Sequence, residues 1–157
     1  MKQIIEQIKS CPAEKVLFLG IGNEARGDDG AGPYFISVLA ARSARHKYKF
    51  LDCGTLPENF TGKIKALSPE LIIFVDAANF GGKKGEIREL AMKEIDGVSA
   101  SPHHLPLTVV AKFLSSEMQP APRFIFVGVQ HGSFEIGDGL DAEVSHALNN
   151  FIASIML

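Results

Sequence analysis

Short runs of consecutive apolar residues, separated by helical patterns, constrain the fold of this chain most strongly. Such runs predict strands at residues 16–19, 71–75 and 123–129, and two shorter patterns that include charged residues, at 48–51 and 86–90, predict two more. Continuous apolar runs are typical of strands that are buried on both faces of a sheet. Helical patterns lie around and between them, at residues 4–8, 33–40, 60–67, 107–114 and 142–155. The chain therefore predicts an α/β fold, a three-layer α/β/α sandwich with a mostly parallel, five-stranded twisted sheet.

One of these strands should run against the others. Only residues 77–85 join the strand at 71–75 to the strand at 86–90. A parallel crossover needs about a dozen residues or more, so the strand at 86–90 is expected to be antiparallel to the preceding one. The following segment, residues 91–104, is long enough to return to the starting edge before the next helix.

Length and charge exclude several classes of protein. The 157 residues, with a net charge of −2, suit a single domain over residues 1–157. Lysine and arginine form no long run, so nucleic acid and anionic membranes are not expected as partners. No apolar run approaches the ~18 residues of a membrane span. The two cysteines make no disulfide framework, and the expectation is a cytoplasmic monomer.

Polar residues follow the predicted strands. In mostly parallel sheets, ligands bind beyond the carboxyl ends of the strands, so these residues should gather at one edge. They are Asp29 after the first strand, Asp52 and Thr55 after the second, Asp76 after the third, and Gln130 and His131 after the last. Residues 101–104, Ser-Pro-His-His, can reach the same edge from the long segment.

A nucleotide site is one interpretation of this edge. Gly20, Gly22 and Ala25 match the G-x-G-x-x-A pattern, and Asp52 ends the next strand as a ribose-binding acid would. However, Asp28 and Asp29 would repel a pyrophosphate. The chain also has no room for a second mononucleotide-binding half. Nucleotide binding is therefore the less favoured alternative.

A cation site uses the same residues better. Asp29, Asp76 and His103 offer two carboxylates and one imidazole, a set that suits zinc, nickel or iron with open positions. Asp28 is the nearest residue that could support these ligands. His103 precedes a predicted helix, whose positive end favours the neutral, metal-binding ring.

Each of these residues also has a purely structural interpretation. Asp76 can cap the turn after its strand, and either Asp28 or Asp29, more naturally Asp28, can cap the helix near Pro33. Asp52 can simply accept backbone N–H groups. His104 is expected to be packed or solvated, and surface positions are expected for the remaining histidines, His46, His131 and His146.

Nucleophilic catalysis finds little support. The chain has no G-x-S-x-G elbow around a serine. Cys53 follows an acid, which should raise the pKa of its thiol, and is expected to be a small core residue. Two carboxylates could instead hold a water molecule as acid and base.

Six blocks of the chain resemble the [NiFe]-hydrogenase maturation endopeptidases. They occur in the family's order over roughly residues 16–135 and are most similar to the branch that processes hydrogenase-3-type large subunits. The blocks are LGIGN at 19–23 with GDDG at 27–30, DCGT at 52–55, IFVDA at 73–77, KGEI at 84–87, SPHHL at 101–105 and FVGVQ at 126–130.

The resemblance implies a fold, a reaction and a site. The fold is a twisted five-stranded sheet between helices. The reaction is one cut that removes a short C-terminal extension from an immature [NiFe]-hydrogenase large subunit after nickel insertion. The family's metal-contacting positions fall on Asp29, Asp76 and His103, of which the first is glutamate in some members. The nickel is carried by the substrate, and no organic cofactor is implied. A non-catalytic nickel- or precursor-binding assembly factor remains the main alternative.

Overall fold

Five strands form one sheet in the order β2-β1-β3-β5-β4 in the computed structural model, which describes residues 1–100, 105–132, 134–137 and 139–157. Their bounds are β1 Val16–Ile21, β2 Lys49–Gly54, β3 Leu71–Ala78, β4 Ile87–Glu89 and β5 Arg123–Gln130. Strands β2, β1, β3 and β5 pair in parallel, whereas β4 pairs antiparallel with β5. The predicted mixed, mostly parallel sheet is confirmed.

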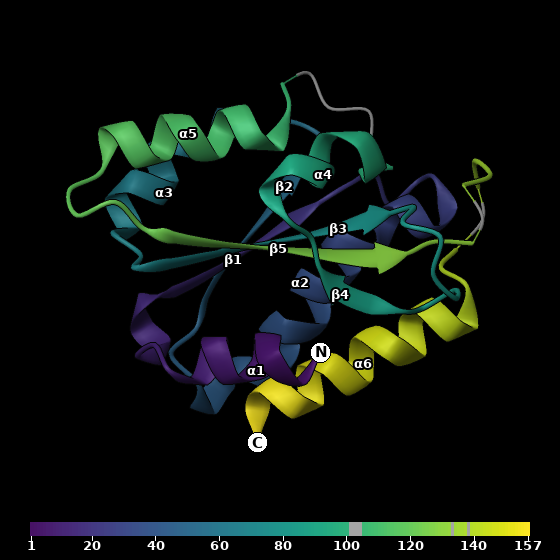
Figure 1. The fold of residues 1–157 in the computed structure, drawn as a ribbon. Helices are drawn as coiled ribbons and strands as arrows, with labels where there is room; N and C mark the ends of the chain where they lie inside the picture. The colour runs from purple at the N-terminus through teal and green to yellow at the C-terminus, as the bar shows by residue number, and fades with distance from the viewer. Residues whose placement is uncertain (101–104, 133, 138) are drawn as a thin grey trace.

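Helices cover both faces of this sheet (Figure 1). One face carries α1 (Lys2–Lys9), α2 (Ala31–Arg42) and α6 (Ala142–Met156), whose buried side chains join a single apolar cluster. The other face carries α3 (Thr61–Leu67), α4 (Met92–Val98) and α5 (Leu107–Glu117), which form a second cluster. No helix in the described part of the chain is both long and apolar enough to cross a membrane.

The central strands divide their side chains between these two clusters. Phe18 and Ile73 pack with α1, α2 and α6, whereas Leu19 and Phe74, one residue further along each strand, pack with α3, α4 and α5. Because successive side chains of a strand point to opposite faces, a sheet covered on both sides needs apolar residues at every position. This explains the apolar runs in the central strands β1, β3 and β5, whereas the edge strands β2 and β4 are less buried and carry charged residues.

The structure differs from the sequence-based expectation in two places. Helix α4 lies within a segment expected only to return the chain, and its single buried residue, Ile95, gives almost no periodic signal. Strand β3 extends to Ala78, so Asp76 lies inside the end of the strand and not after it. The expectation that β4 runs antiparallel to β3 is confirmed, and β4 pairs with β5.

The first turn of α2 is pressed against the ends of β1 and β3. A Cβ atom on Gly32 would lie 2.5 Å from the carbonyl oxygen of Val75 and even closer to the backbone of Ile21. On the strand side, a Cβ atom on Gly20 would lie 2.6 Å from the carbonyl oxygen of Gly32. Backbone atoms cannot move aside as a flexible side chain can. Glycine at both positions is therefore required for this close approach, which also fixes the turn before α2.

Gly32→Ala should test this packing against a matched glycine. We expect Gly32→Ala to lower the free energy of unfolding by about 1–3 kcal/mol, because overpacking forces the helix away from the sheet. In Gly62→Ala, within α3, the new methyl group would meet nothing within 4 Å, and stability should rise by about 0.5–1 kcal/mol. Urea unfolding of both variants measures the difference. Equal shifts in the same direction would contradict the close-packing argument.

Candidate functional site

Two buried aspartates lie on neighbouring elements at the carboxyl edge of the sheet. Asp29 belongs to a 3-10 turn, η2 (Gly27–Gly30), between β1 and α2, and η2 packs against β3, the strand that carries Asp76. Their exposed fractions are 0% and 5%. The structure thus places Asp29 and Asp76 at the predicted edge. The third member of the predicted set, His103, lies outside the described residues, and those described contain no group of three potential metal ligands.

Asp29 is held by polar partners from its own loop. Its Oδ2 accepts the backbone N–H of Asn23 at 3.3 Å and lies 3.6 Å from the guanidinium of Arg26. The Arg26 guanidinium also lies 5.7 Å from the centre of the Phe134 ring, and that ring stacks on His131 with their centres 3.9 Å apart. The Arg26 side chain is 31% exposed, so it can leave Asp29 without unpacking the core.

Asp76 is oriented by a hydroxyl group from the segment that follows α4. Ser99 Oγ donates a hydrogen bond of 2.6 Å to Asp76 Oδ2. The carboxylate belongs to the side of the sheet that carries α4 and α5.

The backbone of residues 98–100 lies alongside the end of β3. Asn79 donates its N–H to the carbonyl of Val98 at 2.8 Å, and Ala100 donates its N–H to that of Ala77 at 3.0 Å. Ser99 also forms an antiparallel bridge with Ala78. The chain therefore reaches residue 100 immediately beside the strand end that carries Asp76. This supports the expectation that the segment returns to this edge before residues 101–104.

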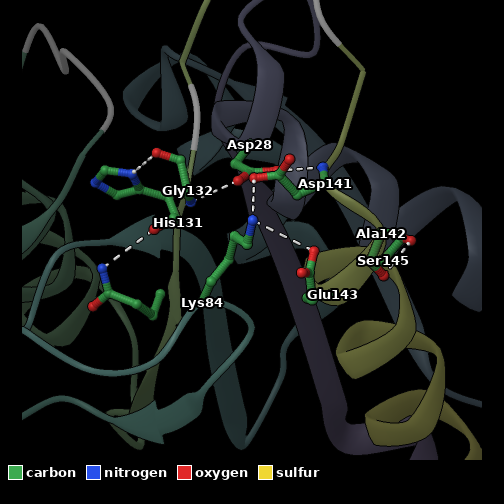
Figure 2. Close-up of polar contacts among 9 residues, drawn as sticks. Asp28, Lys84, His131, Gly132, Asp141, Ala142, Glu143 and Ser145 are labelled. Atoms are coloured by element: carbon green, nitrogen blue, oxygen red, sulfur yellow. Dashed lines mark hydrogen bonds and ion pairs between the residues drawn. The ribbon is translucent and has the colours of Figure 1, made fainter.

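Asp28 has a different role from the one expected. Helix α2 begins after Gly30 without a side-chain cap, so the prediction that Asp28 caps it is wrong. Instead, Asp28 accepts the N–H of Gly132 at 2.7 Å and that of Asp141 at 2.8 Å (Figure 2). These contacts tie η2 to the segments after β5 and before α6.

Burial raises the pKa of Asp28, against the opposite effect of the two N–H donors. The folded state therefore binds this proton more tightly than the unfolded chain does. This tighter proton binding stabilises the folded protein fully at pH values below the ordinary pKa of aspartate. The stabilisation is lost as the pH rises through the higher pKa that Asp28 has in the folded state.

Lys84 extends this network to the first turn of α6. Its ammonium group lies 3.5 Å from the carboxylates of both Asp141 and Glu143 (Figure 2). The two acids raise the pKa of the exposed ammonium group, with Asp141 contributing most. The KGEI block of the sequence, at residues 84–87, thus holds the segment that also binds Asp28.

Gln130 is a structural residue of this edge that the sequence analysis placed but did not explain. It ends β5, is buried, and its Oε1 accepts the N–H groups of Phe80 and Gly82 at 3.0 and 3.1 Å. Its Nε2 donates to Asn79 Oδ1 at 3.2 Å. The sequence did contain a sign of this role, because Gln130 is a polar amide directly after the apolar residues of β5. It shapes the loop between β3 and β4.

Other predicted residues have mostly structural roles. Asp52 is exposed and accepts the N–H of Gly54 at 3.1 Å, which confirms the backbone interpretation. Cys53 is buried among apolar residues, and burial followed by the Asp52 charge raises the pKa of its thiol to about 12. His146 is exposed, as expected, whereas His131 is half-buried through its stacking on Phe134. A neutral, buried thiol is a poor nucleophile.

Comparisons with known proteins agree on one family. A sequence model described as hydrogenase maturation protease matches residues 33–156. The hydrogenase 3 maturation protease of Escherichia coli (strain K12) is 32% identical over 115 residues, covering 73% of this chain and 71% of that protein. The matched range begins after Asp29, so the assignment of that residue depends on its position at the sheet edge and on the resemblance of its GDDG block.

Solved structures show the same fold. The crystal structure of the [NiFe] hydrogenase maturation protease HycI from Thermococcus kodakarensis KOD1 superposes with a TM-score of 0.82 at 27% identity, covering 99% of both chains. The solution structure of the endopeptidase HycI from Escherichia coli gives a TM-score of 0.77 at 27% identity, covering 88% of this chain and 87% of that one.

Asp28→Ala should loosen the segments after β5 and before α6. The change removes the acceptor of the Gly132 and Asp141 N–H groups, which lie in a partly exposed part of the structure, and we expect the free energy of unfolding to fall by about 1–3 kcal/mol. Urea unfolding measures the loss, and hydrogen exchange should become faster at those two amides. Asp52→Asn, at an exposed acid, is the control and should change stability by no more than about 0.5 kcal/mol. Unchanged protection of both amides in Asp28→Ala would contradict this role.

Cys53 should resist alkylation while the protein is folded. In a Cys11→Ala background, we expect iodoacetamide at pH 8 to label Cys53 at least about a thousandfold more slowly in the folded than in the unfolded protein. A pKa of about 12, against the ordinary 9.0, accounts for that factor by itself. Intact mass spectrometry with and without urea follows the reaction. Comparable rates in both states would show that the thiol is accessible and ionised.

Proposed function

The chain belongs to the hydrogenase maturation protease family and is a peptidase. From this premise we propose that it removes a C-terminal extension from the large-subunit precursor of a [NiFe]-hydrogenase, after nickel has been inserted. The observation that carries the proposal is the pair of buried aspartates, Asp29 and Asp76, on contacting elements at the carboxyl edge of the sheet.

Nickel enters this proposal as part of the substrate. Two carboxylates and an imidazole, from Asp29, Asp76 and His103, suit a borderline divalent ion and leave positions for the ligands of the client. Hard oxygen ligands bind such an ion modestly, which fits a contact that must end when the client leaves. Asp76 is already oriented by Ser99.

Arg26 occupies the place of a cation in the free protein. Its guanidinium lies 3.6 Å from Asp29 and offsets the charge of this buried carboxylate. Because the arginine side chain is partly exposed, an arriving metal ion can displace it toward solvent and toward the Phe134 ring, which it already approaches. The buried carboxylate would then exchange one positive partner for another without remaining unpaired.

The attacking group in this proposal is water. Cys53 carries a thiol whose pKa of about 12 keeps it protonated at neutral pH, so it does not serve as nucleophile. A carboxylate at the sheet edge can accept a proton from a water molecule and return it to the leaving amine. Both the nickel ion and the carboxylates can activate that water, and the experiment below separates recognition from hydrolysis.

The alternatives make different predictions. A nucleotide site is disfavoured because Asp28 and Asp29 are buried in the turn before α2, where a pyrophosphate would have to lie. An assembly factor with this fold would bind the precursor and leave its C-terminus intact.

The proposed peptidase acts as a cytoplasmic monomer.

Incubation with purified precursor tests the proposal. We expect the wild-type protein to shorten nickel-loaded precursor and to leave nickel-free precursor uncut, as read by intact mass spectrometry. Asp29→Asn, Asp76→Asn and His103→Ala should each lower the cleavage rate by roughly a thousandfold or more, because each removes a group that contacts the metal or the water.

Glu70→Gln provides the control for charge and folding. Glu70 is an exposed acid before β3, paired with Lys15, at the opposite edge of the sheet. The Glu70→Gln variant should cleave the precursor at the same rate as the wild type. Normal cleavage by His103→Ala or Asp76→Asn would refute the assignment of the site, whereas binding without any cleavage by the wild type would favour the assembly factor.

A further inference from the structure

A second, mostly apolar groove lies between η4 (Pro57–Phe60), the start of α3 and the outer face of α5. It has a volume of about 260 Å³. Exposed apolar side chains of α5 line one wall, with Val109 and Phe113 retaining 45% and 43% of their accessible surface. The complete lining is Glu58, Thr61, Leu105, Val109, Val110 and Phe113.

The groove contains an unusual carboxylate. Both side-chain oxygens of Glu58 are buried, and neither has a hydrogen-bond partner among the residues that the structure describes. The two lysines of α3 have other partners. Lys63 lies 5.6 Å from the centre of the Phe60 ring, and Lys65 lies over Phe113 and pairs with Glu117 at 3.8 Å. Within residues 1–100, 105–132, 134–137 and 139–157, no positive group pairs with Glu58.

A buried carboxylate without a partner destabilises a folded protein. Replacing it with a neutral residue would cost the isolated protein nothing. Its presence next to an open apolar groove is therefore accounted for by a partner that brings a positive group. Arginine and lysine combine such a group with an apolar stem, which suits a groove of this composition.

We propose that this groove binds a segment of the precursor in which one arginine or lysine, flanked by apolar side chains, pairs with Glu58. The inference rests on the proposed function, because it takes the hydrogenase precursor as the partner. Leu105, which lines the groove, lies six residues after Ser99, whose hydroxyl group donates to Asp76 at the sheet edge. A segment bound here would therefore continue toward the carboxyl edge of the sheet, where Asp29 and Asp76 lie.

The first test measures recognition separately from stability. Glu58→Gln should raise KM for the precursor about tenfold and leave kcat unchanged, because it removes a charge pair with the client and touches no reacting group. Its midpoint of urea unfolding should be equal to or higher than that of the wild type. Glu94→Gln, on the same side of the sheet and paired with Arg88, is the control and should change neither KM nor kcat.

The second test reads binding without cleavage. In an Asp76→Asn background, benzoylphenylalanine at Val109 should cross-link to a precursor peptide that contains arginine or lysine, and Glu58→Gln should weaken precursor binding about tenfold by calorimetry. The same photoreactive residue at Leu157, on the far face, should give no cross-link.

The outcomes distinguish this inference from the proposed function. Cleavage with an unchanged KM in Glu58→Gln would refute the proposal that the groove binds the precursor, and so would a cross-link from Val109 to a second copy of the chain. Neither result would contradict the proposed peptidase function. Lower stability of Glu58→Gln with unchanged KM would likewise assign Glu58 a structural role and refute the inference. If precursor binding depends on Glu58 but the wild type cleaves nothing, the groove proposal would be supported and the peptidase function refuted.

Discussion

The arrangement of the site depends on the two backbone hydrogen bonds that Asp28 accepts. Through them a turn near the start of the chain holds Gly132 and Asp141, which come more than a hundred residues later. Lys84 adds a third segment by pairing with Asp141. Because each carboxyl oxygen of Asp28 accepts a separate N–H group, one side chain can hold two later segments against η2. The edge of the sheet is thereby assembled before any client arrives.

Two adjacent acids in one turn have different contacts. Asp28 faces the backbone of the later segments, whereas Asp29 contacts its own loop and the partly exposed Arg26. The 3-10 turn between β1 and α2 makes this division possible, and the close packing of Gly32 against β1 and β3 sets the position of that turn. An acid that joins later segments and the acid of the proposed metal site therefore stand next to each other in this turn.

Local and global features of this chain differ in how well the sequence predicts them. Continuous apolar runs predict the buried strands, because burial on both faces leaves no other pattern, and the strand-end rule then brings Asp29 and Asp76 to one edge. The role of Asp28 was missed because its partners are backbone groups 104 and 113 residues away, which no local pattern reveals. Helix α4 was missed because it buries only Ile95. Glu58 gives no signal at all, since its unusual feature is the lack of a partner in the described structure.

Asp29 and Glu58 are both buried carboxylates, and burial of a charge is unfavourable without a positive partner. The two residues differ in whether such a partner is present. Asp29 has a cation of its own, Arg26, which is exposed enough to be displaced. Glu58 has no such cation among the described residues, so its buried charge favours association with any partner that brings one. In the proposed function and the groove proposal taken together, both carboxylates gain positive charge from the same client, Asp29 from its metal ion and Glu58 from its side chain. Simultaneous engagement of two such sites would favour a precursor that has already received its metal, because a metal-free precursor would satisfy only one of them.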